Sequence, residues 1–146
     1  MQARTVAELG VPYVMMHTRG LPTEMTALAS YSDLRAEVRS ELSQRCLAVH
    51  AAGVPPWLLV ADPGIGFAKT AEHNLSLLHE GLRGFIADLA APSACLAGAT
   101  LVGASRKGFI GKILAQPDPM RRQWGNAATV CAAVAGVSNS HCMQFK

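Results

Sequence analysis

Three short runs of apolar residues stand out along the chain, and each of them ends in polar or glycine-rich residues. They cover residues 11–17 (VPYVMMH), 57–63 (WLLVADP) and 99–105 (ATLVGAS). Within each run the apolar residues are nearly continuous instead of alternating with polar ones, which is typical of parallel strands covered on both faces. The pattern therefore predicts three buried strands.

Segments with helical periodicity lie between and after these strands. In the first two segments, apolar residues recur at spacings of three and four and so form one stripe along a helix. Ser32 or Asp33 can cap the first of these helices, and Thr70 can cap the second. The alternation of strands and helices predicts an α/β fold with a parallel sheet and right-handed crossovers. The expected helices cover residues 32–52, 70 to about 91, 108–115 and 121–136.

Length, charge and residue spacing indicate one domain and argue against several classes of binding partner. Residues 1–146 suffice for one domain, and no linker, charge block or repeat divides them. The net charge of +3 comes without a dense basic block, so nucleic acid is not an expected partner. No apolar stretch reaches the ~20 residues of a membrane span, so we expect no membrane partner. Cysteines and histidines are scattered without ligand spacing, which predicts reduced thiols and no metal site built from this chain alone.

A polar cluster follows each predicted strand, at the carboxyl edge where parallel α/β sheets bind their ligands. In the second cluster, DPGIGF, Asp62 ends the strand, and Gly66 permits a close or left-handed backbone. Asp62 either caps the turn or faces the cleft as a part-buried carboxylate. A carboxylate in the cleft could accept two adjacent N–H groups from a ligand.

The third cluster, SRKG, places two cations where a strand leads into a helix. Positive charge is unfavourable beside a helix N-terminus, so Arg106 and Lys107 are either solvated loop residues or ligand-binding groups. Ser105 adds a hydroxyl group next to them.

In the first cluster, Met16 packs either in the core or against a flat ring of a ligand. His17 is either a hydrogen-bonded residue at the strand end or a ligand contact.

Together the three clusters resemble the dihydropteroate synthase family and its pterin-binding domain. The resemblance rests on MMHTRGLPTEM (15–25), DPGIGFAKTAEHNLSLL (62–78) and GASRKGFIGKIL (103–114). It covers about residues 7–136, whereas residues 137–146 form a divergent tail. It implies a partial (β/α)8 TIM barrel that carries about strands five to seven with their helices and stops before the motif of the eighth strand. The segment TVAELG would then end the helix that precedes the fifth strand.

The resemblance assigns the pterin contacts residue by residue. Asp62 would accept hydrogen bonds from the 2-amino and N3 groups of a pterin ring, and Lys107 would donate to the acceptor atoms of the ring. These two residues are the expected catalytic residues. Met16 matches a methionine that contacts the pterin.

A second set of residues matches the 4-aminobenzoate end of the family's site. Phe67 and Ser105, with Arg106 close by, lie at positions where a carboxylate needs donors, and Gly66 completes the expected substrate-binding residues. The family reaction joins (7,8-dihydropterin-6-yl)methyl diphosphate to 4-aminobenzoate and releases diphosphate, largely through positioning and electrostatics. These two small molecules are therefore the implied partners.

Magnesium is the implied cofactor, but the resemblance places its protein ligand outside this chain. The family holds the diphosphate and Mg²⁺ with a first-strand asparagine and an Arg-Val-His motif of the eighth strand, and His141 is not a convincing substitute. One alternative is therefore a catalytically inactive truncated fragment. Another is the pterin-binding domain of a methyltetrahydrofolate-type methyltransferase, against which the SRK loop argues. The family is usually homodimeric, and we expect the cytoplasm, or an organelle if the chain is part of a eukaryotic multifunctional enzyme.

Overall fold

The computed structural model describes residues 2–79, 99–135 and 142–143, and it contains a parallel sheet with helices between the strands. The strands are hydrogen-bonded in chain order, so each one pairs with its predecessor. This alternation confirms the predicted α/β class. The strands are β1 (Tyr13–Met16), β2 (Leu59–Asp62), β3 (Thr100–Leu101) and β4 (Cys142–Met143). The α-helices are α1 (Gln2–Leu9), α2 (Leu34–Ala51), α3 (Ala71–His79), α5 (Gly108–Ile113) and α6 (Gln123–Ala135), and 3-10 helices cover η1 (Pro56–Leu58) and η2 (Pro119–Arg121).

The predicted caps explain where the two longer crossover helices begin. The Asp33 carboxylate accepts the backbone N–H of Ala36 at 3.0 Å, which caps α2. The Thr70 hydroxyl accepts the backbone N–H of His73 at 3.2 Å, just before α3. The second helix, predicted to run to about residue 91, is confirmed as far as His79, and its remaining part lies outside the described residues. The helix α1 is the one that the segment TVAELG was expected to end.

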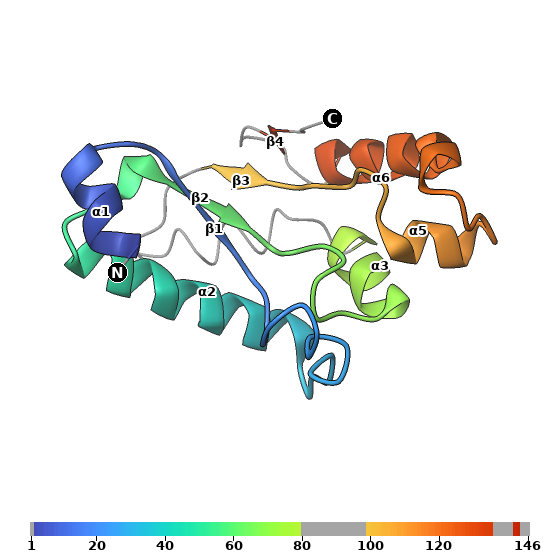
Figure 1. Ribbon diagram of the computed structural model, residues 1–146, viewed down its shortest axis with the longest axis horizontal. Helices are drawn as coiled ribbons and strands as arrows, with labels where there is room; N and C mark the ends of the chain where they lie inside the picture. The colour runs from blue at the N-terminus through green and yellow to red at the C-terminus, as the bar shows by residue number, and fades with distance from the viewer. Residues whose placement is uncertain (1, 80–98, 136–141, 144–146) are drawn as a thin grey trace.

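Figure 1 shows how the helices and strands are arranged, and two apolar clusters hold these elements together. In the first, the predicted stripe of α2 packs against the β1–β2 face that carries Met15 and Ala61. In the second, α3, α5 and α6 meet around Ile65, Phe109 and Ile110, beyond the end of β2. The buried stripe of α2 consists of Val38, Leu42, Cys46 and Val49. The carboxyl ends of the strands therefore point toward the loops that lead into α3 and α5.

The structure differs from the sequence-based expectation in two places. A short β4 pairs with β3 in addition to the three predicted strands. This pairing is made by backbone hydrogen bonds between β3 and β4. Backbone hydrogen bonds do not depend on a pattern of apolar side chains, so no pattern in the sequence indicated them. The second difference concerns Val14 in β1, which is 43% exposed. Since α2 covers one face of β1 and β2 is its neighbour in the sheet, the described elements do not cover this strand on both faces as its apolar run predicted.

Gly64 fixes how closely the turn after β2 approaches the end of β1. Its φ is +69°, and a Cβ atom there would lie 1.8 Å from the carbonyl oxygen of His17. The backbone N–H of His17 in turn donates to Asp62 O at 2.8 Å. Only glycine satisfies both the left-handed conformation and this contact.

We expect Gly64→Ala to lower the free energy of unfolding by more than about 3 kcal/mol, because backbone must move as well as adopt a strained φ. Gly10→Ala is the matched control, since Gly10 has φ +62° but nothing within 4 Å of a Cβ atom. It should cost only about 1 kcal/mol for the left-handed conformation. Urea denaturation of both variants measures the difference, and equal losses would show that the contact with His17 does not matter.

Candidate active site

The register of the sheet places the ends of the first two strands side by side. Met16 lies opposite Asp62 and Met15 opposite Ala61. Because side chains alternate between the two faces, Met16 and Asp62 share the face away from α2, while Met15 and Ala61 face the core. Met16 is half-buried. The expected gathering of the first two clusters at one edge of the sheet is therefore present in the backbone.

Asp62 is almost fully buried at the end of β2, with 7% of its surface exposed. Its Oδ1 accepts the backbone N–H of Gly64 at 2.8 Å, so it does cap the turn. Within the described residues, Oδ2 has no hydrogen-bond donor. Burial raises the pKa of Asp62 above its ordinary value, although the Gly64 N–H and the cations Lys107 and Lys69 oppose this rise. The carboxylate thus caps the turn and still has acceptor sites for a ligand.

Lys107 is brought to Asp62 from the loop that precedes α5. Its ammonium lies 4.1 Å from the centre of the Phe67 ring. Partial burial lowers the pKa of Lys107, while the charge of Asp62 acts in the opposite direction. A Cβ atom on Gly66 would lie 3.0 Å from Lys107 Cδ, so the glycine leaves room for the lysine stem. The structure therefore brings four of the predicted site residues together: Asp62, Gly66, Phe67 and Lys107.

Ser105 and Arg106 lie on the same loop as Lys107, but they line a hollow of the surface that does not include Asp62 or Phe67. This hollow has a volume of about 240 Å³ and is also lined by Arg122 and Asn126. Arg106 is exposed and has φ +57°, a left-handed conformation that few residues other than glycine adopt. The buried Oδ1 of Asn126 accepts no hydrogen bond within the described ranges. The two residues are thus neighbours of the Asp62 cluster along the chain and not members of it.

Lys69 is a part-buried cation that the sequence patterns did not single out. Its Nζ donates to His17 Nδ1 at 2.9 Å, to Phe67 O at 3.1 Å and to Gly64 O at 3.2 Å. These three bonds use all three N–H groups of an ammonium. Burial lowers the pKa of Lys69 to about 7, against the attraction of Asp62. The lysine thus fixes the backbone of the loop that carries Gly66 and Phe67.

His17 is the hydrogen-bonded residue at the strand end that the sequence left as one of two possibilities. It is fully buried, and its Nε2 lies 3.1 Å from Glu41 Oε2. A lysine can only donate, so Nδ1 is the acceptor and Nε2 carries the proton that goes to Glu41. Burial and then the charge of Lys69 lower the pKa of His17 to about 4, which keeps the ring neutral.

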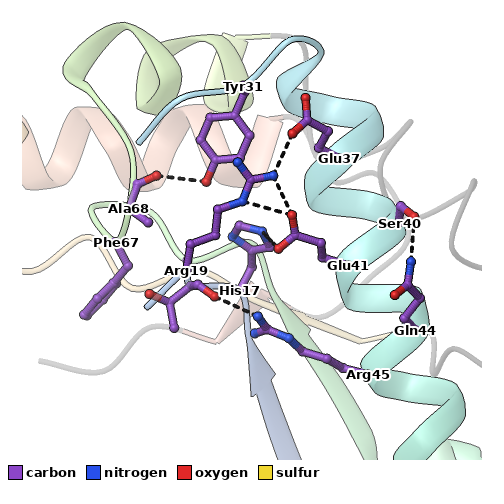
Figure 2. A network of polar contacts seen from close by, with 12 residues as sticks. His17, Arg19, Tyr31, Glu37, Ser40, Glu41, Gln44, Arg45, Phe67 and Ala68 are labelled. Atoms are coloured by element: carbon purple, nitrogen blue, oxygen red, sulfur yellow. Dashed lines mark hydrogen bonds and ion pairs between the residues drawn. The ribbon is translucent and has the colours of Figure 1, made fainter. Parts of the chain in front are cut away.

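Figure 2 shows how a second cation joins this network from the loop after β1. Arg19 donates to both Glu37 and Glu41 on α2 and lies 4.0 Å from the centre of the Tyr31 ring. The Tyr31 hydroxyl donates to Ala68 O at 2.8 Å. The loop after β1, the loop after β2 and α2 are therefore joined by polar contacts at one end of the sheet.

Asn74 supports the same loop from α3. It is fully buried, its Oδ1 accepts the backbone N–H of Gly66 at 2.7 Å, and its Nδ2 donates to Thr70 O at 2.6 Å. Its position four residues after Thr70 places it on the first turn of the helix, facing the loop. A polar residue between the apolar positions of a predicted helix was the only signal in the sequence for this role.

The family comparison agrees with this geometry. A model of the family described as pterin binding enzyme matches residues 1–139. The chain belongs to this family. The resemblance to dihydropteroate synthase is confirmed as well: a dihydropteroate synthase from Synechocystis is 45% identical over 130 residues, which are 89% of this chain and 42% of the relative. A mitochondrial folate synthesis bifunctional protein from Arabidopsis thaliana is 38% identical over 93% of this chain and 25% of its own length.

Solved structures of dihydropteroate synthases are also similar to this chain. The dihydropteroate synthase from Thermus thermophilus in complex with 6HMPPP has a TM-score of 0.83 and 35% identity, and the match covers 98% of this chain and 52% of that chain. The same enzyme in complex with 4-aminobenzoate also has a TM-score of 0.83, with 54% of that chain covered. The chain therefore spans about half the length, or less, of the relatives that it matches.

Neither a metal cluster nor a membrane helix occurs in the part of the chain that the structure describes. No group of three or more His, Cys, Asp or Glu side chains there could hold a metal ion. Among these described residues the structure therefore offers no cluster of side chains that would hold Mg²⁺ without further ligands. In the same residues no helix is long and apolar enough to cross a bilayer.

The lowered pKa of His17 predicts a specific pH dependence of stability. The folded value of about 4 lies below the ordinary 6.5, so the unfolded chain binds the extra proton between these values. The free energy of unfolding should therefore fall as the pH falls from 6.5 toward 4, by up to about 3 kcal/mol.

The variant His17→Asn should flatten this slope between about pH 5 and pH 6.5, a window above the titration of ordinary carboxylates. The matched control is His79→Asn, which changes an exposed histidine at the end of α3. Urea denaturation at a series of pH values measures the slope. An unchanged slope in His17→Asn would mean that His17 is not the residue that takes up the proton.

Proposed function

We propose that this chain supplies the pterin-binding wall of a dihydropteroate synthase active site. The reaction would be the condensation of (7,8-dihydropterin-6-yl)methyl diphosphate with 4-aminobenzoate, which yields dihydropteroate and diphosphate. The observation that carries the proposal is the cluster of Asp62, Lys107 and Phe67 at the carboxyl ends of the strands. The ligands of the two Thermus thermophilus complexes, 6HMPPP and 4-aminobenzoate, belong to the same reaction.

The chemistry of the cluster suits a flat heterocycle with donors on one edge and acceptors on another. Asp62 retains free acceptor sites at a buried position, which fits the adjacent 2-amino and N3 groups of a pterin. Lys107 lies over the Phe67 ring and can donate to acceptor atoms of the pterin. Met16, on the same face as Asp62, provides a polarisable contact for the ring. These residues would bind and orient the pterin without taking part in covalent chemistry.

The hollow beside Ser105 and Arg106 supports the second half of the proposal. A serine hydroxyl and an exposed guanidinium are donors for a carboxylate, and about 240 Å³ is sufficient for a small aromatic acid. In the proposed reaction the C–O bond to the diphosphate breaks, and the amine of 4-aminobenzoate forms the new C–N bond and loses a proton. The chain's own residues would contribute positioning and electrostatic stabilisation.

Assembly, cofactor and location extend the proposal beyond this chain. We propose that the active protein is a homodimer that uses Mg²⁺ held outside this chain. We place it in the cytoplasm, or in an organelle if the chain is part of a multifunctional enzyme. The proposed location draws on the relationship to the Synechocystis enzyme on one side and to the mitochondrial bifunctional protein of Arabidopsis thaliana on the other. The dimer and Mg²⁺ are proposed from the family resemblance alone.

We expect Asp62→Ala and Lys107→Ala each to weaken the binding of a pterin analogue several-fold or more. Each change removes a charged hydrogen-bonding group from a buried site. Titration calorimetry with the 146-residue chain measures the affinities, and the control is Lys112→Ala, an exposed lysine on α5. Wild-type affinity in both Asp62→Ala and Lys107→Ala would refute the proposed pterin site.

The raised pKa of Asp62 predicts the acid limb of pterin binding. Only the ionised carboxylate accepts from both donor groups, so affinity should fall as the carboxylate gains a proton. Because burial raises its pKa, this loss should begin at a higher pH than it would for an aspartate with the ordinary value of 3.8. In Asp62→Asn the acid limb should disappear along with most of the affinity. An acid limb that persists in Asp62→Asn would assign it to another group.

A further inference from the structure

Arg122 joins two segments of backbone near the site without contacting any of the proposed substrate-binding side chains. Its Nε donates to Gln116 O at 3.0 Å, and its Nη2 donates to Pro117 O at 2.7 Å. Its Nη1 donates to Arg106 O at 2.9 Å and to Lys107 O at 3.3 Å. One guanidinium, located just before α6, thus donates hydrogen bonds to four backbone carbonyl groups in two loops.

The two carbonyls on the SRKG loop are the ones that set the direction of Lys107. Arg106 has φ +57°, so the chain bends there in a way that costs free energy for a residue with a Cβ atom. The bend lets the carbonyls of Arg106 and Lys107 reach the same Nη1. Directly after it, Lys107 is the extended N-cap residue of α5, and its side chain runs back to Phe67. The guanidinium therefore holds the strained bend from which Lys107 departs.

Gly111 supplies an independent observation for the same contact. It lies in α5, where glycine is less favourable than alanine. A Cβ atom at this position would lie 2.5 Å from Arg122 Nε and 2.6 Å from Cζ. The helix thus has its smallest residue where the guanidinium passes, which is the mark of a packing requirement.

We propose that Arg122 is a positioning residue, which holds the loop of residues 105–107 so that Lys107 faces Asp62 and Phe67. The proposal rests on the pterin-binding function proposed above for Lys107 and Asp62. A planar guanidinium with five N–H donors can serve four carbonyls at once, whereas the three donors of a lysine ammonium radiate from one atom. Charge alone is therefore not sufficient for this role.

Four variants of the 146-residue chain test the proposal by the affinity for a pterin analogue in titration calorimetry. Arg122→Met and Arg122→Lys should both lose about tenfold in affinity, since a small displacement of a binding group has a large effect. The control is Arg121→Met, which removes the exposed neighbouring arginine and should leave the affinity unchanged. Gly111→Ala should weaken binding several-fold although alanine favours the helix, because its methyl group displaces the guanidinium.

A second readout reports on Lys107 itself. The chain has four lysines, so ¹³Cε labelling gives a small set of signals whose pH titration can be followed by NMR. Burial lowers the pKa of Lys107 in the native loop, and the value should rise toward that of a solvated lysine in Arg122→Met and in Gly111→Ala. It should not change in Arg121→Met. A change in stability alone would not move this titration.

The outcomes separate this inference from the proposed function. Unchanged Lys107 titration in Arg122→Met would overturn the positioning role. Wild-type affinity in Arg122→Lys would overturn it as well, provided that Asp62→Asn does weaken pterin binding. If Arg122→Met does not fold, the Lys107 titration and the pterin affinity of Gly111→Ala test the proposal instead. This variant disrupts the same contact and places a helix-forming residue in α5. If the Lys107 titration shifts but neither Arg122→Met nor Asp62→Asn changes the pterin affinity, the positioning role stands and the proposed function fails.

Discussion

The part-buried ammonium of Lys69 connects the ends of the first two strands, and the site depends on this contact. An ammonium that has lost part of its water needs hydrogen-bond acceptors in place of that water. His17 Nδ1 and two carbonyls of the loop after β2 supply three acceptors. The loop must therefore keep the conformation that presents these carbonyls. The same requirement explains the neutral imidazole of His17, whose Nδ1 is available only when it carries no proton.

The conformation of this loop determines what its side chains can do. With the carbonyls of Gly64 and Phe67 turned toward Lys69, the Asp62 carboxylate caps the turn with one oxygen and offers its other acceptor sites. The Phe67 ring then lies where Lys107 can cross it. The close approach of Gly64 to His17 explains why no larger residue fits between the two loops. The geometry proposed for pterin recognition is thus a consequence of backbone constraints.

The polar groups around the site serve two different purposes. Lys69, His17, Glu41 and Arg19 satisfy one another and the backbone, so they rigidify the ends of the strands. Asp62 and Lys107 retain hydrogen-bonding capacity that the described residues do not use, as expected of groups that face a ligand. Arg122 belongs to the first kind, although it lies beside residues of the second. A cation close to a predicted site is therefore not by itself a ligand contact.

The order of strands and helices and the helix caps were determined by the sequence alone, because apolar periodicity and capping are local properties. The family was also evident from the sequence, through the resemblance of its three motifs. Asp62, Gly66 and Lys107 could be named from their place in the polar clusters that follow the strands, whereas Phe67 was named from the family resemblance. The tertiary structure decided that Ser105 and Arg106 line a separate hollow and that β4 pairs with β3. It also decided the roles of Lys69, Asn74 and Arg122. These roles consist of hydrogen bonds to backbone groups, often distant in the chain, and no side-chain pattern in the sequence records which carbonyl needs a donor.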